Sequence, residues 1–341
     1  MDKIFNMKCF VTGATGFIGA NLCRELLKRG YAVRILLREN SLKTAIQGLD
    51  VEYAYGDVVD KSGLEKLIRG CDWCFHVAAS YHLWMKDYRK MYETNVEGTR
   101  NVIEAATNVG CSRIVYTSTV GCIALPKIID GKVAPSDETT PVFESQMSNH
   151  YKLSKFKAEQ IAKELAQKGS PVVIVNPSAP IGPYDVKPTP TGKVIVDFLN
   201  RKMPAYLDTG LNWVHVRDVA IGHILAAEKG KIGDRYILGN REGNLTMEET
   251  FKLLDELSRI PAPKFKIPYP VALFFAYVNE LFSKLTNIPP KAPIAGVRMA
   301  KYKMFFNPQK AINELGLPQT PIREAFSDAI NWFKENGYVK R

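Results

Sequence analysis

The fold is decided by one glycine-rich stretch near the N-terminus, Thr12-Gly13-Ala14-Thr15-Gly16-Phe17-Ile18-Gly19. It joins a β-branched run, Met7–Thr12, to an amphipathic helical pattern over Phe17–Arg29, and its glycines are spaced Gly-x-x-Gly-x-x-Gly. In such a strand-turn-helix unit, the first glycine permits the tight turn, the second lets the backbone approach a pyrophosphate, and the third lets the helix pack closely on the sheet. The helix N-terminus then directs N–H groups at the phosphates. We therefore predict a dinucleotide site formed by Gly13, Thr15, Gly16, Phe17, Ile18 and Gly19.

After this turn, the first half of the chain alternates short apolar runs with helical patterns. Strands are predicted at Ala32–Leu37, Val51–Tyr55, Trp73–Val77, Arg113–Ser118 and Pro171–Asn176, and helices at Lys61–Arg69, Tyr88–Asn108 and Asn149–Lys168. This alternation indicates βαβ units, so we expect an α/β fold with a doubly wound parallel Rossmann sheet. We predict an NAD(P)-binding Rossmann domain over residues 1–178. A smaller α/β lobe, mainly for substrate, is predicted over 179–341, with residues 205–240 returning in part to the sheet.

The composition is that of an ordinary globular protein, with 341 residues of which 46% are hydrophobic and 24% charged. The net charge is +11, but the basic residues match no nucleic-acid module, so we expect no nucleic-acid partner. No apolar run of about 18 residues predicts a transmembrane segment, and the N-terminus lacks a signal-peptide pattern, which favours the cytoplasm. Cys71 and Cys74 have metal or redox spacing, but no second pair follows. We expect free thiols and no metal site.

Charged residues after the second and third predicted strands indicate how the adenosine end of the cofactor is bound. Arg38 stands where an acidic residue would accept a hydrogen bond from the ribose 2′-OH, and a guanidinium there suits a 2′-phosphate. Lys43 would add a second positive charge. Asp57 follows the third strand, where it can accept a hydrogen bond from the adenine amino group or cap a helix. We therefore expect NADP(H) as the preferred cofactor, with NAD(H) as the alternative.

Tyr151 and Lys155 are four residues apart on a predicted helix, so their side chains project from one face. A phenol has a pKa near 10, and a nearby ammonium and a cationic nicotinamide would lower this pKa toward neutrality. A hydroxyl at the end of the fifth strand would help the phenol polarise a substrate carbonyl. Ser118 and Thr119 are both candidates, and either could instead cap a turn.

Together these motifs resemble the extended short-chain dehydrogenase/reductases, of the NAD-dependent epimerase/dehydratase superfamily. The resemblance covers nearly the whole chain and includes the segments Asn95-Val96-Glu97-Gly98-Thr99 and Val214-His215-Val216-Arg217-Asp218-Val219-Ala220. It implies a catalytic triad of Thr119, Tyr151 and Lys155. Most relatives have Ser at the first position, so Thr119 is a departure that keeps the hydroxyl. The resemblance also implies cofactor contacts from Val58, Ala78, Ala79, Tyr151, Lys155, Pro177 and Ser178.

Within that family, the chain is similar to dihydroflavonol-4-reductase-like ketone reductases and to the proteins labelled hopanoid-associated sugar epimerases. The second likeness is carried by Phe75–Ala79, Asn176–Pro183 and Asp208–Val216. The resemblance implies an NADP(H)-dependent oxidoreductase that transfers a hydride between nicotinamide and a carbonyl or secondary alcohol of a bulky small molecule. The alternative is an NAD-dependent sugar or nucleotide-sugar epimerase. A non-catalytic NADP-sensing protein is a third hypothesis, which the intact triad disfavours.

Two features favour the reductase over the epimerase. A reductase exchanges its cofactor with the cellular pool, which suits a matched NADPH site at Arg38. Nucleotide-sugar epimerases commonly have an Arg that clamps the pyrophosphate where this chain has Leu211, and an apolar side chain cannot form that bidentate contact. Other arginines, at Arg201, Arg217, Arg235 or Arg298, would have to compensate.

An aromatic-rich wall is predicted around the substrate, which suits a bulky and partly apolar molecule. Its candidate residues are Ser80, Tyr81, His82, Trp84, Tyr184 and Trp213. A second apolar segment, Val271–Lys284, is flanked by lysines. We favour a helix that caps the substrate lobe or forms a homodimer contact over a helix that lies on a membrane surface.

Overall fold

The computed structural model describes residues 7–286, 288–290 and 292–340. A seven-stranded parallel sheet occupies its centre, with the order β12-β8-β5-β4-β1-β2-β3. The strands are β1 (Lys8–Thr12), β2 (Ala32–Leu37), β3 (Glu52–Tyr55), β4 (Trp73–His76), β5 (Arg113–Thr117), β8 (Val172–Pro177) and β12 (Arg235–Leu238). From β1 the chain adds β2 and β3 on one side of the sheet and then β4 and the later strands on the other side, as in a Rossmann fold. The prediction of a doubly wound α/β sheet is therefore confirmed.

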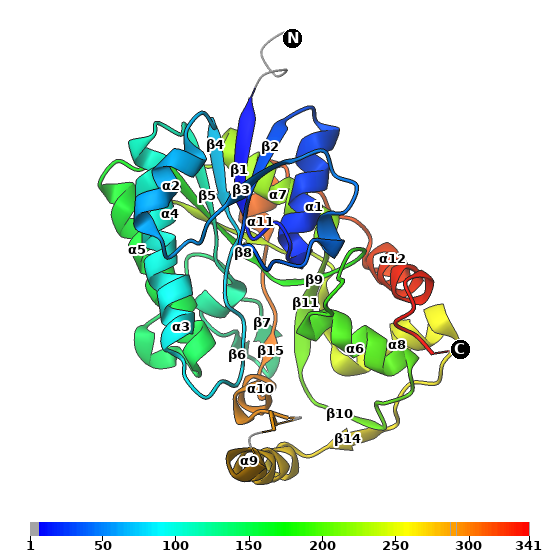
Figure 1. The fold of residues 1–341 in the computed structure, drawn as a ribbon. Helices are drawn as coiled ribbons and strands as arrows, with labels where there is room; N and C mark the ends of the chain where they lie inside the picture. Colours follow the sequence, from blue (N-terminus) through cyan, green and yellow to red (C-terminus); the bar gives the residue numbers. More distant parts are fainter. Residues whose placement is uncertain (1–6, 287, 291, 341) are drawn as a thin grey trace.

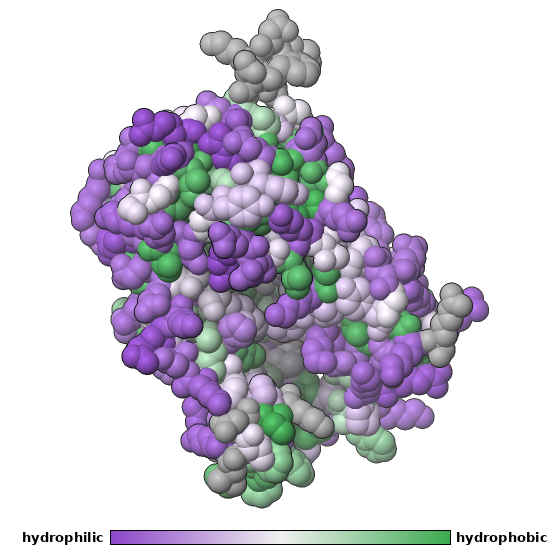
Figure 2. All heavy atoms as spheres, viewed as in Figure 1, coloured by the Kyte–Doolittle hydropathy of each residue, from purple (hydrophilic) through white to green (hydrophobic). Residues whose placement is uncertain are grey.

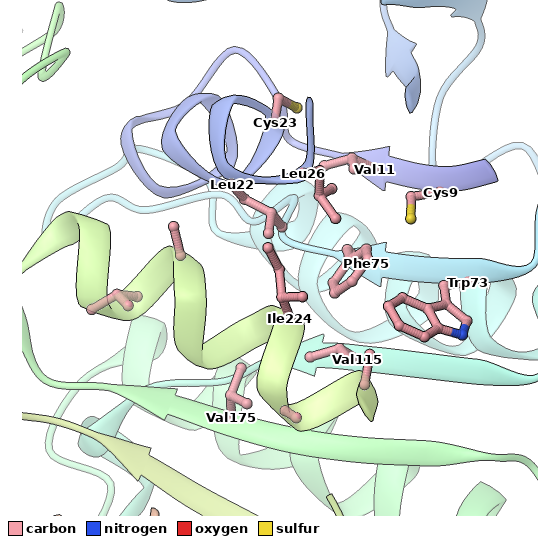
Figure 3. Close-up of a cluster of buried hydrophobic side chains, with 14 of the residues drawn as sticks. Cys9, Val11, Leu22, Cys23, Leu26, Trp73, Phe75, Val115, Val175 and Ile224 are labelled. Carbon is pink, nitrogen blue, oxygen red and sulfur yellow. The ribbon is translucent and has the colours of Figure 1, made fainter. Parts of the chain in front are cut away.

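Helices cover both faces of the sheet (Figure 1). One face packs on α1 (Phe17–Lys28), α7 (Val216–Lys229) and α11 (Gln309–Leu315), and the other on α2 (Lys61–Ile68), α4 (Gly98–Asn108) and α5 (His150–Gln167). Because strand side chains alternate between faces, Val11 joins the first core while its neighbour Phe10 joins the second. Figure 3 shows the first core, in which Leu22 and Leu26 of α1 meet Phe75 and Ile224.

A smaller lobe follows the sheet and has its own apolar core. Its strands are β9 (Ala179–Ile181), β10 (Ala205–Leu207), β11 (Gly210–His215), β13 (Asn244–Thr246), β14 (Phe265–Ile267) and β15 (Lys303–Met304). Its core lies among α6 (Pro190–Leu199), α8 (Met247–Ser258) and α12 (Ile322–Glu335). Within 205–240, β12 joins the central sheet and α7 packs on it, whereas β10 and β11 stay in the lobe. The division at residue 178 remains a prediction.

The helical segment predicted over Tyr88–Asn108 is not one regular helix. It consists of α3 (Arg89–Tyr92), a π-helical turn η3 (Glu93–Glu97) and α4. A π turn inserts one extra residue per turn, and such turns are frequent at functional sites. Here it changes the direction in which the Asn95 side chain projects, and no hydrophobic periodicity predicts that change.

Helix α9 (Tyr269–Thr286) and the short α10 (Ile294–Met299) lie together at one end of the molecule (Figure 1). The expectation that this segment caps the substrate lobe is wrong. Phe274, Leu281 and Phe282 lie on the surface, with 64%, 62% and 59% of their area exposed to solvent. A helix that covered the lobe core would bury these side chains. In the described part of the chain, no helix is long and apolar enough to cross a membrane.

Candidate active site

The glycine-rich turn lies between β1 and α1, and its geometry requires glycine at two positions. Gly13 has a φ of +71°, and a Cβ on it would lie 2.6 Å from the backbone N of Ala78. A Cβ on Gly19 would overlap the carbonyl oxygen of Gly13 and lie 2.9 Å from Ala14 Cα. Gly16 is the N-cap of α1 and brings no side chain to the N–H groups of the first turn. This cradle fits a pyrophosphate, which binds to such N–H groups.

The other predicted cofactor residues lie along the same edge of the sheet. Thr15, Phe17 and Ile18 belong to the turn and to the start of α1, Asp57 and Val58 follow β3, Ala78 and Ala79 follow β4, Pro177 ends β8 and Ser178 follows it. The carboxyl ends of parallel strands meet at one edge, which is where ligands bind in this architecture. Ser178 Oγ donates to the carbonyl of Leu238 at 3.3 Å, so this hydroxyl also ties β8 to β12.

Arg38 follows β2 at the same edge of the sheet. Its backbone N donates to Ser41 Oγ at 3.1 Å, which turns the chain there, while its side chain is exposed. Lys43 is placed differently, because its Nζ donates to the hydroxyl of Tyr55 at 3.0 Å and lies 4.7 Å from the ring centroid of Tyr53. The Asp57 carboxylate accepts from the backbone N of Val59 at 3.2 Å, which forms a local turn. Among the described residues, aromatic side chains hold Lys43 but not Arg38.

The two hydroxyl candidates after β5 have different partners. Ser118 Oγ donates to Glu159 Oε2 at 2.6 Å, and both side chains are buried. Thr119 begins the short turn η4 (Val120–Cys122), where its Oγ1 accepts from the backbone N of Gly121 at 3.1 Å. That bond leaves the Thr119 hydroxyl proton available for donation. The geometry therefore favours Thr119 as the residue that donates to a substrate oxygen.

Tyr151 lies in the first turn of α5 and faces Thr119. Asn149 caps this helix, its Oδ1 accepting from the backbone N of Lys152 at 2.9 Å, which holds the first turn in place. Burial raises the pKa of the Tyr151 phenol well above its usual value, the nearby Tyr81 raises it further, and a hydrogen bond with Thr119 lowers it. A phenol in this setting is protonated at neutral pH and can act as a proton donor.

Lys155 lies one helical turn further along α5, with 2% of its surface exposed. Its Nζ donates to the carbonyl oxygen of Thr117 at 2.6 Å and lies 4.5 Å from the ring centroid of Tyr116. Burial lowers the pKa of the amine to about 8. The strand end and the helix therefore bring Thr119, Tyr151 and Lys155 into one place, although residues 119 and 151 are far apart in the sequence.

A chain of buried hydrogen bonds connects the glycine-rich turn with the π turn, and it fixes the tautomer of His76. Thr99 Oγ1 donates to the carbonyl of Asn95 at 2.6 Å, so it must accept from His76 Nε2, which lies 3.1 Å away. His76 Nδ1 is then an acceptor for the hydroxyl of Thr12 at 2.8 Å. Thr12 Oγ1 in turn accepts from the backbone N of Ala78 at 3.1 Å. Burial and the charge of Lys155 lower the pKa of His76 to about 3, so the ring stays neutral.

Asn95, which the π turn directs inward, holds the segment in front of Tyr151. Its Oδ1 accepts from the backbone N of Ser80 at 2.7 Å, and its Nδ2 donates to the carbonyl of Ser80 at 3.0 Å. The same Nδ2 donates to Ser154 Oγ at 2.9 Å, and that hydroxyl donates to the carbonyl of Tyr151 at 2.8 Å. One amide thus sets the distance between the proton donor and the chain that follows β4.

Glu159 is a buried acid beneath the site, with 1% of its surface exposed. Its carboxylate accepts from Arg235 Nη1 at 3.1 Å and from Asn176 Nδ2 at 2.9 Å, besides Ser118, and it pairs with Lys163 Nζ at 2.9 Å. Burial by itself would raise the pKa of Glu159, but Lys163 and Arg235 hold this pKa below its usual value. Asn176 Nδ2 also donates to the carbonyl of Thr119 at 2.9 Å, so the cluster positions the backbone of Thr119.

The predicted substrate residues fall into separate places. The Tyr81 ring packs edge-on against the Tyr151 ring, with centroids 4.4 Å apart, and it is 38% exposed. Ser80 is held by Asn95, while His82 is exposed and Trp84 half-buried in the same segment. Tyr184 lies instead against α1, where Arg24 is 3.5 Å from its ring centroid.

Trp213 requires a correction. It is completely buried in the core of the smaller lobe, packs against Phe326, and donates from Nε1 to Thr250 Oγ1 at 3.0 Å. A side chain without exposed surface cannot line an open pocket, so the prediction that Trp213 contacts substrate is wrong. Its position on a strand next to a His-Val segment suggested a site residue. Its indole instead belongs to the core, where the N–H donates to a buried hydroxyl.

Sequence reasoning assigned no role in the site to Thr12, His76, Asn95, Ser154, Glu159 or Asn176. His76 and Asn176 stand within apolar strands, and Glu159 recurs on the helical face that carries Tyr151 and Lys155. Polar residues at positions where the pattern requires apolar ones are a signal of a buried network.

Neither metal ligands nor disulfides are part of the site. All six cysteines are buried and free. Across residues 7–286, 288–290 and 292–340, no three His, Cys, Asp or Glu side chains are grouped so as to hold a metal ion.

Comparisons with known proteins agree with this architecture. The sequence profile described as the NAD dependent epimerase/dehydratase family matches residues 9–239. A Synechocystis sp. protein provisionally named dihydroflavonol 4-reductase is 46% identical over 97% of this chain and 96% of its own length. The sterol demethylase protein B of Methylococcus capsulatus is 32% identical over 98% of this chain and 100% of its own length. The crystal structure of gox2253 has a TM-score of 0.85 and 43% identity, and covers 98% of this chain and 100% of that one.

Proposed function

Because this chain belongs to the NAD dependent epimerase/dehydratase family, whose members are NAD(P)-dependent enzymes acting on CH–OH or C=O groups, we propose that it is an NADP(H)-dependent carbonyl reductase. Its substrate is a bulky and largely apolar small molecule. The observation that carries the proposal is the position of Arg38, an exposed guanidinium after β2 that no neighbouring ring holds. A guanidinium in this place suits the dianionic 2′-phosphate of NADP(H).

The residues present fit this cofactor. The glycine-rich turn accepts the pyrophosphate without a Cβ in the way, and Arg38 is available to the 2′-phosphate through two parallel hydrogen bonds. Asp57 and Val58 would hold the adenine, and Lys155 would bind the hydroxyls of the nicotinamide ribose. When bound, NADPH supplies the hydride that reduces a carbonyl carbon. The protein contributes binding, orientation and a proton.

Tyr151 donates that proton to the carbonyl oxygen. The phenol is protonated in the free protein because burial raises its pKa. Thr119 donates a hydrogen bond to the same oxygen, which stabilises the negative charge that develops there. Lys155, with its pKa near 8, is mostly charged at neutral pH, and this charge stabilises the Tyr151 phenolate once the proton has left. Of these three groups only Tyr151 gives up its proton, while Thr119 keeps its proton and Lys155 keeps its charge.

The proposed substrate class rests on the segment in front of Tyr151. Tyr81 lies against the phenol of Tyr151, and Trp84 follows in the same segment. Aromatic side chains beside a proton donor suit a flat, apolar substrate more than a highly hydroxylated one. Two of the similar proteins carry the names of a dihydroflavonol reaction and a sterol reaction, which supports the same class.

The test is to identify the nucleotide that the protein holds and prefers. We expect protein purified under native conditions to release no stoichiometric NAD on denaturation. Titration should give an affinity for NADPH at least about tenfold higher than for NADH, because a charge-assisted hydrogen bond contributes about 1.5–3 kcal/mol. Stoichiometric NAD in the denatured protein, or equal affinities for the two cofactors, would contradict the proposal.

The alternative is an NAD-dependent sugar or nucleotide-sugar epimerase, which the name of the family itself supports. The arginines that would have to bind a sugar-nucleotide pyrophosphate in place of Leu211 are mostly engaged within the protein. Arg217 bonds Glu324 at 3.1 Å, Arg235 bonds the buried Glu159, and Arg298 bonds the Tyr277 hydroxyl at 2.9 Å. Each contact would have to break before the arginine could bind a diphosphate, which disfavours the epimerase.

A further inference from the structure

Helix α9 presents a continuous apolar stripe to the outside of the molecule. Its large exposed residues are Val271, Phe274, Phe275, Val278, Leu281 and Phe282. Their spacing of three and four places them on one face of an α-helix. In Figure 2 the hydrophobic colour gathers at the lower end of the molecule, over α9. Isolated exposed apolar residues are ordinary, whereas a stripe of this length marks an interaction surface.

The opposite face of α9 holds the helix on the protein. Ala276 and Ser283, seven residues apart, are 0% and 1% exposed. Glu280 Oε1 accepts from the backbone N of Ile294 at 2.8 Å, and the Tyr277 hydroxyl accepts from Arg298 Nη2 at 2.9 Å, so both bonds join α9 to α10. The small residues therefore face inward, and the stripe faces outward as a consequence of this packing.

The segment that carries the stripe is strongly basic. Residues 264–303 contain seven Lys or Arg and one acidic residue, so they contribute +6 of the chain's net charge of +11. Lys264, Lys266 and Lys284 are exposed on either side of the helix. One carboxylate from outside the segment offsets part of this charge, because Asp208 lies 3.6 Å from Lys266 Nζ and 3.8 Å from Lys303 Nζ. An apolar stripe flanked by lysines is the pattern of a helix that lies in the interface of an anionic bilayer.

We propose that α9 docks the protein on the surface of an anionic lipid bilayer, with the stripe in the acyl boundary and the flanking lysines at the headgroups. A second copy of the chain fits this surface less well, because a symmetric contact would bring two segments of charge +6 together. A cavity of about 300 Å³ lies beside the start of α9. Lys266 and Lys301 line it together with Asp208, Ile267 and Tyr269, and the Asp208 carboxylate offsets part of the positive charge there.

The docking surface is connected to the candidate active site by direct contacts. A Cβ placed on Gly296 of α10 would lie 3.4 Å from Leu83 Cδ1, so α10 touches the segment that follows β4. Two residues earlier in that segment, Tyr81 packs on Tyr151. Docking by α9 therefore places the wall of the site close to the lipid surface. This inference rests on α9 and its surroundings and does not depend on which cofactor or reaction the site has.

Co-sedimentation with lipid vesicles tests the proposal on the full chain. We expect the protein to pellet with vesicles of phosphatidylcholine and phosphatidylglycerol in equal parts, and much less with phosphatidylcholine alone. The double substitution Phe274→Glu with Leu281→Glu should reduce the bound fraction at least about tenfold, because both side chains leave the acyl boundary. Lys264→Gln and Lys284→Gln should each weaken binding about fivefold, since a lysine near an anionic surface contributes about that factor.

The matched control is Phe143→Glu, because Phe143 is 63% exposed but lies outside α9. It should bind vesicles like the wild type, and all variants should keep the wild-type circular dichroism and thermal unfolding. A cysteine-specific environment-sensitive dye at Val278→Cys gives a second readout, since the six native cysteines are buried. Its emission should shift to the blue with anionic vesicles. Absence of wild-type pelleting overturns the proposal, and so does a solution dimer that the Phe274→Glu, Leu281→Glu variant loses.

Discussion

The two sides of the candidate active site are built differently. Behind Tyr151, three ionisable groups are buried and bonded: Lys155 to the Thr117 carbonyl, Glu159 to four partners, and His76 to two hydroxyls. In front of Tyr151, the segment from Tyr81 to Lys86 is half-buried or exposed. Buried polar groups have few alternative arrangements, whereas exposed side chains have many. Substitutions behind Tyr151 should therefore have large effects, and substitutions in front of it small ones.

The largest effect should follow removal of the proton donor. Tyr151→Phe is expected to reduce turnover of any carbonyl that the wild type reduces by about 10²–10⁴-fold, because a positioned general acid contributes about that factor. NADPH affinity should remain within a few-fold of wild type. Steady-state kinetics and a nucleotide titration measure the two quantities.

The control for that variant is Tyr81→Phe, which removes a hydroxyl from the adjacent ring on the exposed side. Its turnover should stay within a few-fold of the wild-type value. Equal losses in the two variants would mean that the phenol of Tyr151 has no special role.

The next largest effect concerns stability. Glu159→Gln leaves Arg235 and Lys163 without their buried counter-charge, and removal of one partner from a buried ion pair costs about 3–5 kcal/mol. Urea denaturation should show this loss in the free energy of unfolding. Glu164→Gln is the matched control on the same helix, since Glu164 pairs with Lys168 at the surface. That exposed pair should contribute less than about 1 kcal/mol, and a similar loss in both variants would contradict the comparison.

A smaller effect is expected at the cofactor's ribose. Arg38→Asp should weaken NADPH binding by about tenfold to a hundredfold and reverse the preference in favour of NADH, because the acid repels the 2′-phosphate and accepts from a free 2′-OH. Lys43→Gln serves as the control, since the Lys43 amine is held by Tyr55 and Tyr53. Unchanged NADPH affinity in Arg38→Asp would remove the main support for the reductase.

The smallest effect separates function from stability at one residue. Folding lowers the pKa of Lys155 from 10.5 to about 8, so the unfolded chain binds more protons between these values and wild-type stability rises with pH across that window. Burial of the charged amine therefore destabilises the wild type by about 3 kcal/mol at neutral pH. Lys155→Met removes this cost, but it also removes a charge-assisted hydrogen bond that contributes about 2 kcal/mol. Lys155→Met should therefore be about 1 kcal/mol more stable than wild type at pH 7 while losing turnover.

Urea denaturation of both proteins at a series of pH values is the measurement. The advantage of Lys155→Met should disappear and then reverse as the pH rises from about 8 to above 10.5, because the wild-type amine is then neutral in both states and keeps its hydrogen bond. A constant difference across that range would mean that burial of the amine does not set the pKa of Lys155.

The periodic parts of the sequence predicted the fold correctly. The strand-turn-helix unit at the N-terminus and the alternation that follows match β1, α1, β2 and most later elements to within one or two residues, whereas the helix predicted over Tyr88–Asn108 is interrupted by the π turn. These elements depend on local signals: apolar periodicity, and glycines that permit close approach. Spacing also identified Tyr151 and Lys155 on one helix face and left Ser118 and Thr119 open at the strand end, and the family resemblance favoured Thr119.

Contacts between distant segments required the structure. Trp213 has the sequence context of a site residue, yet the tertiary fold buries it, and α9 has the composition of a capping helix, yet its apolar stripe lies outside. The choice between Ser118 and Thr119 by geometry depends on Glu159, which is 41 residues away from Ser118. The sequence by itself determined the sheet and the glycine-rich turn, since each follows from a short pattern, and it supplied the candidates for the reacting groups. Only the tertiary structure decided which side chains are buried and paired, because burial depends on what packs against a residue from elsewhere in the chain.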